Sequence, residues 1–129
     1  LGYELDLTKL SQEDRKSVAK QVKEYKKIRQ ITQFGKLYRL KSARTSNQCA
    51  WEVISPDQNE VILSVVKMMA SGQPAITKTK LVGLDENRHY KDQDSHLVYG
   101  GDELMNLGIY DPVEQGDFKA QMYHFKAID

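Results

Sequence analysis

Residues 49–69 read CAWEVISPDQNEVILSVVKMM. Two segments rich in β-branched and aromatic residues, Cys49–Ile54 and Glu60–Met69, flank the run Ser55–Asn59, which contains Pro, Asp and Asn. These compositions are typical of two strands joined by a turn. The period of the hydrophobic pattern in this stretch is two, which favours strands.

The first of these strands also indicates which side chains form the core. Cys49, Trp51 and Val53 alternate along it and should therefore point to one face of the sheet. We expect that face to be buried, with Cys49 as a small hydrophobe and Trp51 between two sheets. A nucleophilic role for Cys49 is not supported by this pattern.

Further short strands follow the same pattern on both sides of this stretch. They are predicted at Lys36–Lys41, Ile76–Leu81, His96–Tyr99 and Phe118–Ile128, with turns at Ser71–Pro74, Gly83–Asn87 and Gly100–Gly101. A parallel sheet would require helices between the strands, and no helical pattern interrupts them. The sequence therefore predicts a mainly β fold, an antiparallel β-sandwich of the Greek-key type.

One helix is predicted before the strands, from Ser11 to Gln30. Ser11 is a favourable N-cap, and the helix is expected to end in a basic last turn. A helical spacing places one apolar stripe along it: Val18, Val22, Tyr25 and Ile28. Gly2–Leu7 alternates weakly and suits a short strand, and the change of period after Thr32 marks a domain boundary.

Composition excludes several classes of function. The 129 residues carry a net charge of only +1, so no electrostatic field favours nucleic acid or an anionic membrane. No apolar run approaches the ~18 residues of a membrane span. Cys49 is the single Cys and cannot form an internal disulfide, which fits a cytoplasmic location. Because the chain opens on Leu1 inside what reads as a folded unit, we expect it to be truncated.

The adjacent carboxylates Asp102 and Glu103 are one candidate for catalysis, because glycosidases use a pair of carboxyl residues as their catalytic groups. Neighbouring residues on a strand point to opposite faces, so the two could act on one sugar only in an irregular loop. Their position after Gly100 and Gly101 favours the alternative, a turn stabilised by the Asp side chain.

A metal site is the second candidate. Asp92, Asp94 and His96 would share one face if extended, and could then bind a divalent cation. The same alternation is typical of the solvent side of an edge strand, and no further cluster completes a coordination sphere, so the pattern favours no metal and no cofactor. His89 and His124 are isolated and are interpreted as surface or packed residues.

The aromatic residues offer a third possibility. Tyrosines could stack on sugar rings in a carbohydrate-binding module, with Tyr90, Tyr99 and Tyr110 as the candidates. Trp51 and Tyr38 fit buried strand positions better.

The sequence also resembles the C-terminal region of bacterial family 36 α-galactosidases over essentially its whole length. The matching segments are, in order, Leu1–Leu7, Ser11–Gln30, Phe34–Leu40, Ala50–Ser55, Leu81–Leu84, Tyr99–Ile109 and Gly116–Phe118. The run Gly101–Asn106 is the strongest match, and Lys36 departs from the family, in which an acidic residue is common at that place.

The resemblance implies a division at residue 33. Residues 1–33 would be the last strand and helix of the catalytic (β/α)8 barrel, and 34–129 the complete C-terminal β-sandwich. Such enzymes hydrolyse terminal α-galactosides of the melibiose and raffinose type with retention, using two Asp residues on earlier barrel strands.

No catalytic residue is therefore transferred onto this chain, which alone should be inactive. Glu4, Leu5 and Asp6 have the only geometric route to a barrel pocket. The expected partners are the rest of the barrel, α-galactosides through the parent enzyme, and other copies of the chain. A galactoside-binding module and an oligomer-contact domain remain alternatives.

Overall fold

The computed structural model describes residues 3–72, 76–112 and 116–129. The chain divides into two compact units, one ending at Gln30 and the other extending from Ile31 to Asp129. Each unit is described by itself below.

The helix α1 spans Gln12–Phe34 and runs from the first unit into the second. Ser11 is its N-cap, as predicted, since Ser11 Oγ accepts a hydrogen bond of 3.1 Å from the Asp14 amide. The helix continues beyond Gln30 to Phe34, so the expected basic last turn is wrong. It ends at Gly35, where a Cβ atom would lie 2.5 Å from the Ile31 carbonyl oxygen and 2.6 Å from Val53 Cγ1, so that only glycine fits.

The strand expected at Gly2–Leu7 is not formed by its described residues, Tyr3–Leu7. Asp6 Oδ1 instead accepts hydrogen bonds from the amide and the hydroxyl of Thr8, at 3.0 and 2.6 Å, and this turn replaces an extended course. The Tyr3 hydroxyl bonds to Gln21 of α1. A strand requires a hydrogen-bonded neighbour, and the described part of the chain gives this segment none.

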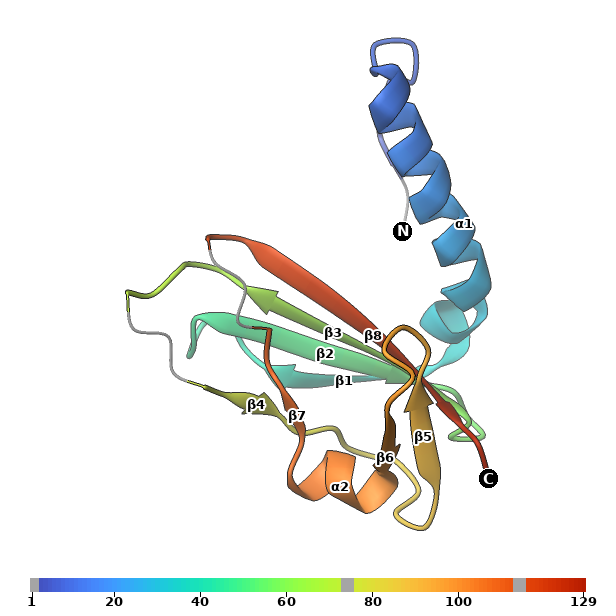
Figure 1. Ribbon diagram of the computed structural model, residues 1–129, viewed down its shortest axis with the longest axis vertical. Coiled ribbons are helices and arrows are strands. Elements are labelled where there is room, and N and C mark those ends of the chain that lie inside the picture. Colours follow the sequence, from blue (N-terminus) through green and yellow to red (C-terminus); the bar gives the residue numbers. More distant parts are fainter. Residues whose placement is uncertain (1–2, 73–75, 113–115) are drawn as a thin grey trace. The chain divides into compact units, whose positions relative to one another are not determined.

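The second unit is an antiparallel sheet of six strands facing a small sheet of two (Figure 1). The large sheet has the order β1-β2-β3-β8-β5-β6, so that β8 returns between β3 and β5 as in a Greek key. Its strands are β1 (Lys36–Lys41), β2 (Gln48–Ile54), β3 (Glu60–Lys67), β5 (His89–Asp92), β6 (Val98–Gly100) and β8 (Lys119–Ala127). The small sheet pairs β4 (Lys78–Thr79) with β7 (Ile109–Tyr110), and the helix α2 (Gly101–Asn106) precedes β7.

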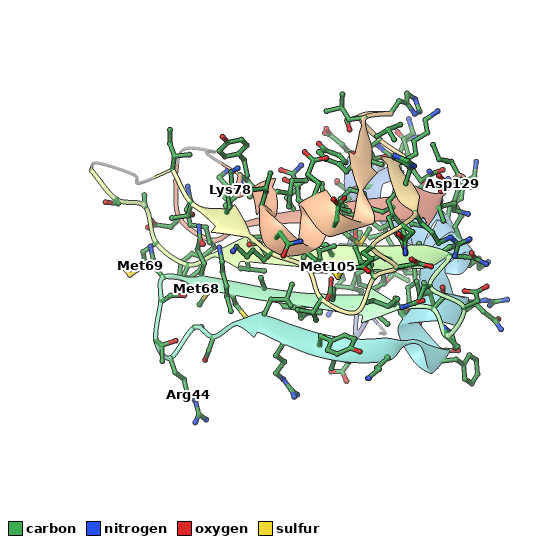
Figure 2. The ribbon with its side chains drawn as sticks, turned by 90° about the horizontal axis from the view of Figure 1, so that it is seen from below. Arg44, Met68, Met69, Lys78, Met105 and Asp129 are labelled. Atoms are coloured by element: carbon green, nitrogen blue, oxygen red, sulfur yellow. The ribbon has the colours of Figure 1, made fainter. Side chains whose placement is uncertain are left out.

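The core lies between the large sheet and a covering layer formed by the small sheet, segment 81–84 and α2. Large side chains of the two layers are fully buried there, among them Leu63 and Phe125 from the large sheet and Leu81 and Leu104 from the covering layer. Met105 packs against this core from α2 (Figure 2). The predicted sandwich is therefore confirmed, with a second layer that is smaller than the first.

The core lies on the opposite face of β2 from the one predicted. Ala50, Glu52 and Ile54 are buried against the covering layer, whereas Trp51 is only half-buried on the other face. Trp51 is therefore not buried between the two sheets. The alternation correctly placed Cys49, Trp51 and Val53 on one face. The other face carries Glu52, and because a carboxyl residue is rarely buried, the pattern favours the face of Trp51 as the buried one.

The predicted strands are recovered with altered bounds. Lys36–Lys41 is confirmed as β1, while the strand expected at Ile76–Leu81 is reduced to Lys78–Thr79. The segment expected to begin at His96 starts at Val98, because His96 has φ of 63° and belongs to the turn after β5. The elements β5, β7 and α2 were not predicted, and the turn predicted at Ser71–Pro74 lies partly outside the described residues.

Candidate functional site

The carboxylates Asp102 and Glu103 lie in the first turn of α2 and serve that helix. Asp102 Oδ1 accepts a hydrogen bond of 2.8 Å from the Glu103 amide, and Glu103 Oε2 accepts one of 3.3 Å from the Gly100 amide. Gly101 permits the close packing of the helix start, since a Cβ there would overlap the Asp85 carbonyl oxygen. The expectation that the Asp102 side chain bonds to the backbone is confirmed, although in a helix start rather than a turn, and Glu103 adds a bond that was not predicted.

Asp92, Asp94 and His96 do not share one strand face. Asp92 is buried at the end of β5, and its Oδ2 accepts bonds of 3.1 and 2.6 Å from the Ser95 amide and hydroxyl. Asp94 and His96 are exposed in the turn that follows. Over residues 3–72, 76–112 and 116–129, no group of three or more His, Cys, Asp or Glu side chains could hold a metal ion.

The two isolated histidines each contact a carboxylate. His89 Nδ1 lies 2.6 Å from Asp129 Oδ2 at the end of the chain, and His124 Nε2 lies 3.2 Å from Glu60 Oε2. Lys126 shares Glu60, at 2.9 Å from Oε1. Burial acts to raise the pKa of Glu60, but hydrogen bonds from Lys126 and His124 outweigh it and lower that pKa. Lys126 and Glu60 form an ion pair, and the two histidine contacts are hydrogen bonds between side chains.

Three tyrosines meet in one groove, which we call the tyrosine groove. Tyr99, Tyr110 and Tyr123 line it together with Asp94, Glu103 and Gln121, and its volume is about 380 Å³. The groove joins β6, β7 and β8 with the turn after β5. Of the tyrosines proposed for stacking on a sugar, Tyr99 and Tyr110 are here, whereas Tyr90 is fully buried in the core.

The floor of the tyrosine groove packs against the core. Tyr99 contacts the buried Phe125 edge to face, with ring centroids 6.0 Å apart. Tyr123 stacks on the same ring, with centroids 6.1 Å apart. Such aromatic pairs add to the stability that burial alone provides. Burial raises the pKa of both tyrosines. The carboxylate of Asp92 raises the pKa of Tyr99 further, and those of Asp111 and Asp92 raise the pKa of Tyr123. Both phenols are therefore protonated at neutral pH and available as hydrogen-bond donors.

The wall of the groove is more open. Tyr110 is 60% exposed. Lys78 Nζ lies 4.3 Å from the centre of the Tyr110 ring, in a cation–π contact. Sequence reasoning missed Tyr123 and Gln121 because both lie in the strand β8, where nothing in the pattern marks them as more than surface and core positions.

The face of the large sheet that points away from the small sheet is a second candidate, and we call it the outer face. Strand register places Leu37 beside Val53 and Arg39 beside Trp51, with Cys49 and Val66 in the next row. Leu37 is 50% exposed and Trp51 is half-buried. Beside them, a hollow of about 1350 Å³ surrounds the turn between β1 and β2 and includes Arg44, which Figure 2 shows projecting from that turn.

Glu52 is a buried acid that the sequence analysis did not single out. Its side chain is fully buried on the core side of β2, where Oε1 accepts a hydrogen bond of 2.8 Å from the Val82 amide and Oε2 has no partner among the described residues. Burial raises the pKa of Glu52 to about 7, and the bond from Val82 only partly opposes this. The residues Glu4, Leu5 and Asp6, by contrast, are exposed in the first unit.

A partly buried polar network connects the two sheets. Asp111 accepts hydrogen bonds from Lys41 Nζ, at 2.6 Å, and from the hydroxyls of Thr77 and Thr79. Gln48 joins it through a bond of 2.8 Å from Lys41 Nζ. The network fixes the small sheet on β1 and β2, and no local pattern in the sequence could reveal it, because Lys41 and Asp111 are 70 residues apart.

Comparisons with known proteins agree on one family. Residues 48–125 match the model of the glycosyl hydrolase family 36 C-terminal domain. The chain is 62% identical over its whole length to α-galactosidase Mel36A of Lactobacillus acidophilus, and 38% identical over 98% of its length to α-galactosidase AgaA of Geobacillus stearothermophilus. It spans only 18% and 17% of those two proteins.

Solved structures show the same relationship. The crystal structure of AgaA matches 98% of this chain with a TM-score of 0.94, and the chain covers 18% of it. A variant of AgaA was crystallised in complex with raffinose, and that structure matches with a TM-score of 0.93 at 37% identity. The described part of this chain contains no helix that is long and apolar enough to cross a membrane.

Proposed function

The chain belongs to the C-terminal domain family of glycosyl hydrolase family 36, and from this membership we propose that it is the accessory β-sandwich of an α-galactosidase. The parent enzyme would hydrolyse terminal α-galactosides of the melibiose and raffinose type with retention of configuration. Two carboxylates about 5 to 5.5 Å apart perform such a reaction, one as nucleophile and one as acid. We place both outside these 129 residues, in a cytoplasmic enzyme.

The role of the domain itself is to pack on the catalytic barrel and stabilise it. The observation that carries this proposal is the outer face, where Leu37, Trp51, Cys49 and Val66 form an apolar surface on the side of the sheet away from the core. The hollow beside it has a volume of about 1350 Å³. A small-molecule site typically encloses roughly 300 to roughly 1000 Å³, so the larger hollow suits a protein surface.

The test uses the enzyme that contains this chain. Leu37→Arg places a charge on the outer face, and we expect it to shorten the half-life of α-galactosidase activity at elevated temperature while the initial rate on a nitrophenyl α-galactoside stays unchanged. Val82→Arg is the matched control, because Val82 is also an exposed apolar residue, at 39%, but lies outside both the outer face and the tyrosine groove. Equal half-lives for the two variants would contradict the assignment of the outer face.

The isolated chain tests whether the catalytic residues lie outside it. It should release no nitrophenol above a buffer control, since nothing replaces a missing nucleophile and acid. Turnover by the pure chain would return Asp102 and Glu103 to consideration.

A further inference from the structure

We propose that the tyrosine groove is a non-catalytic binding site for α-galactosides, separate from the barrel site that the proposed function requires. The groove lies on the opposite side of the large sheet from the outer face, so docking of a barrel there leaves it free. Its volume is about 380 Å³. This value falls within the range that is usual for small-molecule sites.

The lining of the groove suits a neutral sugar. Tyr110 and the nearby Leu97 and Leu107 are all more than half exposed, and they offer apolar surface to the C–H side of a pyranose ring. Asp94 and Glu103 offer carboxylate oxygens, which accept hydrogen bonds from sugar hydroxyls. A hexose presents an apolar ring face and several hydroxyls. The apolar side chains of the groove can pack on the ring face, and the carboxylates can accept hydrogen bonds from the hydroxyls.

The charge of the groove argues against anionic ligands. Its described lining holds Asp92, Asp94 and Glu103 against the single cation Lys78, whose ammonium already lies over the Tyr110 ring. A phosphate or an acidic sugar would be repelled by this excess of carboxylates. A neutral polyol is not, because it donates hydrogen bonds to them.

The site is also preformed. Tyr99 and Tyr123 both pack on the buried Phe125 ring, and both keep their phenol protons, so their hydroxyls can donate hydrogen bonds. Binding therefore immobilises few side chains, and the loss of entropy that weakens binding at flexible surfaces is small. The choice of galactose over other hexoses rests on the proposed function, because the relatives of this chain are α-galactosidases.

The test is titration of the ¹⁵N-labelled chain with melibiose, followed by amide chemical shifts. We expect saturable shifts at millimolar sugar for residues of the groove, Gln121 among them, and at least about tenfold weaker binding in Tyr110→Ala. Gln121→Ala provides a second variant at an exposed position, should Tyr110→Ala not fold. Tyr3→Ala is the matched control, because Tyr3 is 52% exposed but lies in the first unit.

Isomaltose, which carries glucose in place of the galactose of melibiose, tests the sugar class. Weaker shifts with isomaltose support a galactoside site, and equal shifts overturn that assignment. The absence of saturable shifts with melibiose, or shifts that survive both groove variants, would overturn the site itself. Neither result affects the proposed role of the outer face, which is tested by the stability of the full enzyme.

Discussion

Lys41 Nζ lies 2.6 Å from Asp111 Oδ2 and ties the edge strand β1 of the large sheet to the end of β7 in the small one. The Asp111 carboxylate is nearly fully buried, and the two threonine hydroxyls complete its hydrogen bonds. The covering layer is thus fixed by a charged contact in addition to its apolar core.

Asp111→Ala should lower the free energy of unfolding by about 3 kcal/mol, because it leaves the ammonium of Lys41 without its buried partner. Urea denaturation at pH 7 measures the change. Glu86 is exposed and serves as the control position. Glu86→Ala should change the free energy of unfolding by less than about 0.5 kcal/mol, as surface substitutions usually do. Similar midpoints for the two variants would show that Lys41 is satisfied by water.

Acid should weaken the same contact. Burial acts to raise the pKa of Asp111, but bonds from Lys41, Thr77 and Thr79 outweigh it, and the pKa is lowered. The ionised Asp111 carboxylate therefore stabilises the fold fully at pH values above 3.8, its pKa in the unfolded chain. This stabilisation is lost as the pH falls through the lower pKa of the folded protein. In Asp111→Asn this acid-dependent loss should disappear from the stability profile.

Glu52 should have the opposite effect on the pH profile. Its pKa is raised from 4.5 in the unfolded chain to about 7 by burial, so its contribution is most favourable below pH 4.5 and is lost as the pH rises through 7. Above pH 7, ionisation of the buried Glu52 carboxyl should lower the free energy of unfolding by about 3 kcal/mol relative to its value at acidic pH. Glu52→Gln should flatten the decline in stability between about pH 5 and pH 8, measured by urea denaturation at each pH. Curves that remain parallel to the wild type would show that Glu52 ionises freely.

Truncation of two aromatic residues distinguishes the faces of the large sheet. Phe125 is fully buried and supports Tyr99 and Tyr123. Phe125→Ala should therefore cost about 3 to 5 kcal/mol. Trp51→Ala should cost less than half as much in the isolated chain, since its side chain lies on the half-exposed outer face. Denaturation midpoints of both variants provide the comparison, and an equal loss would mean that Trp51 is covered in solution.

The first unit should support association between copies of the chain. Val18, Val22 and Tyr25 are only half-buried on α1, and a hollow of about 650 Å³ lined by Leu7, Val18 and Val22 lies beside them. Burial of such a stripe is favourable, and a two-fold pair is the commonest arrangement. Val22→Lys should convert a dimer to a monomer in light scattering, whereas Ser17→Lys on the exposed side of the helix should not. A monomeric wild type would contradict this.

Local patterns were sufficient for the elements whose residues alternate over several positions. The bounds of β1 were correct, and β2, β3 and β8 were located to within two residues, since each has a long run of strand-forming residues. The N-cap of α1 followed from Ser11 alone. The two-residue strand β7 was not predicted and β4 was predicted too long, because these strands exist only through pairing with each other across the fold.

The candidate site depends even more on contacts between residues that are distant in the sequence, and local patterns do not reveal such contacts. Alternation placed Cys49, Trp51 and Val53 on one face of the sheet, yet which face is covered depends on segment 81–84 and α2, far along the chain. The tyrosine groove brings together β6, β7 and β8, and only Tyr99 and Tyr110 stood out as aromatic residues beforehand. Asp102 and Glu103 were recognisable as backbone-stabilising residues because their role is local.

The central position of β8 has a consequence for biosynthesis. Among the described strands, β8 alone joins β1-β2-β3 to β5-β6, and Figure 1 shows it between those two groups. During synthesis, β8 leaves the ribosomal exit tunnel after every other strand of the large sheet. Until then β1-β2-β3 and β5-β6 cannot pair into one sheet, and Val61, Leu63 and Tyr90 stay exposed. A nascent chain arrested before Lys119 would therefore hold two open edges and become a substrate for chaperones and proteases.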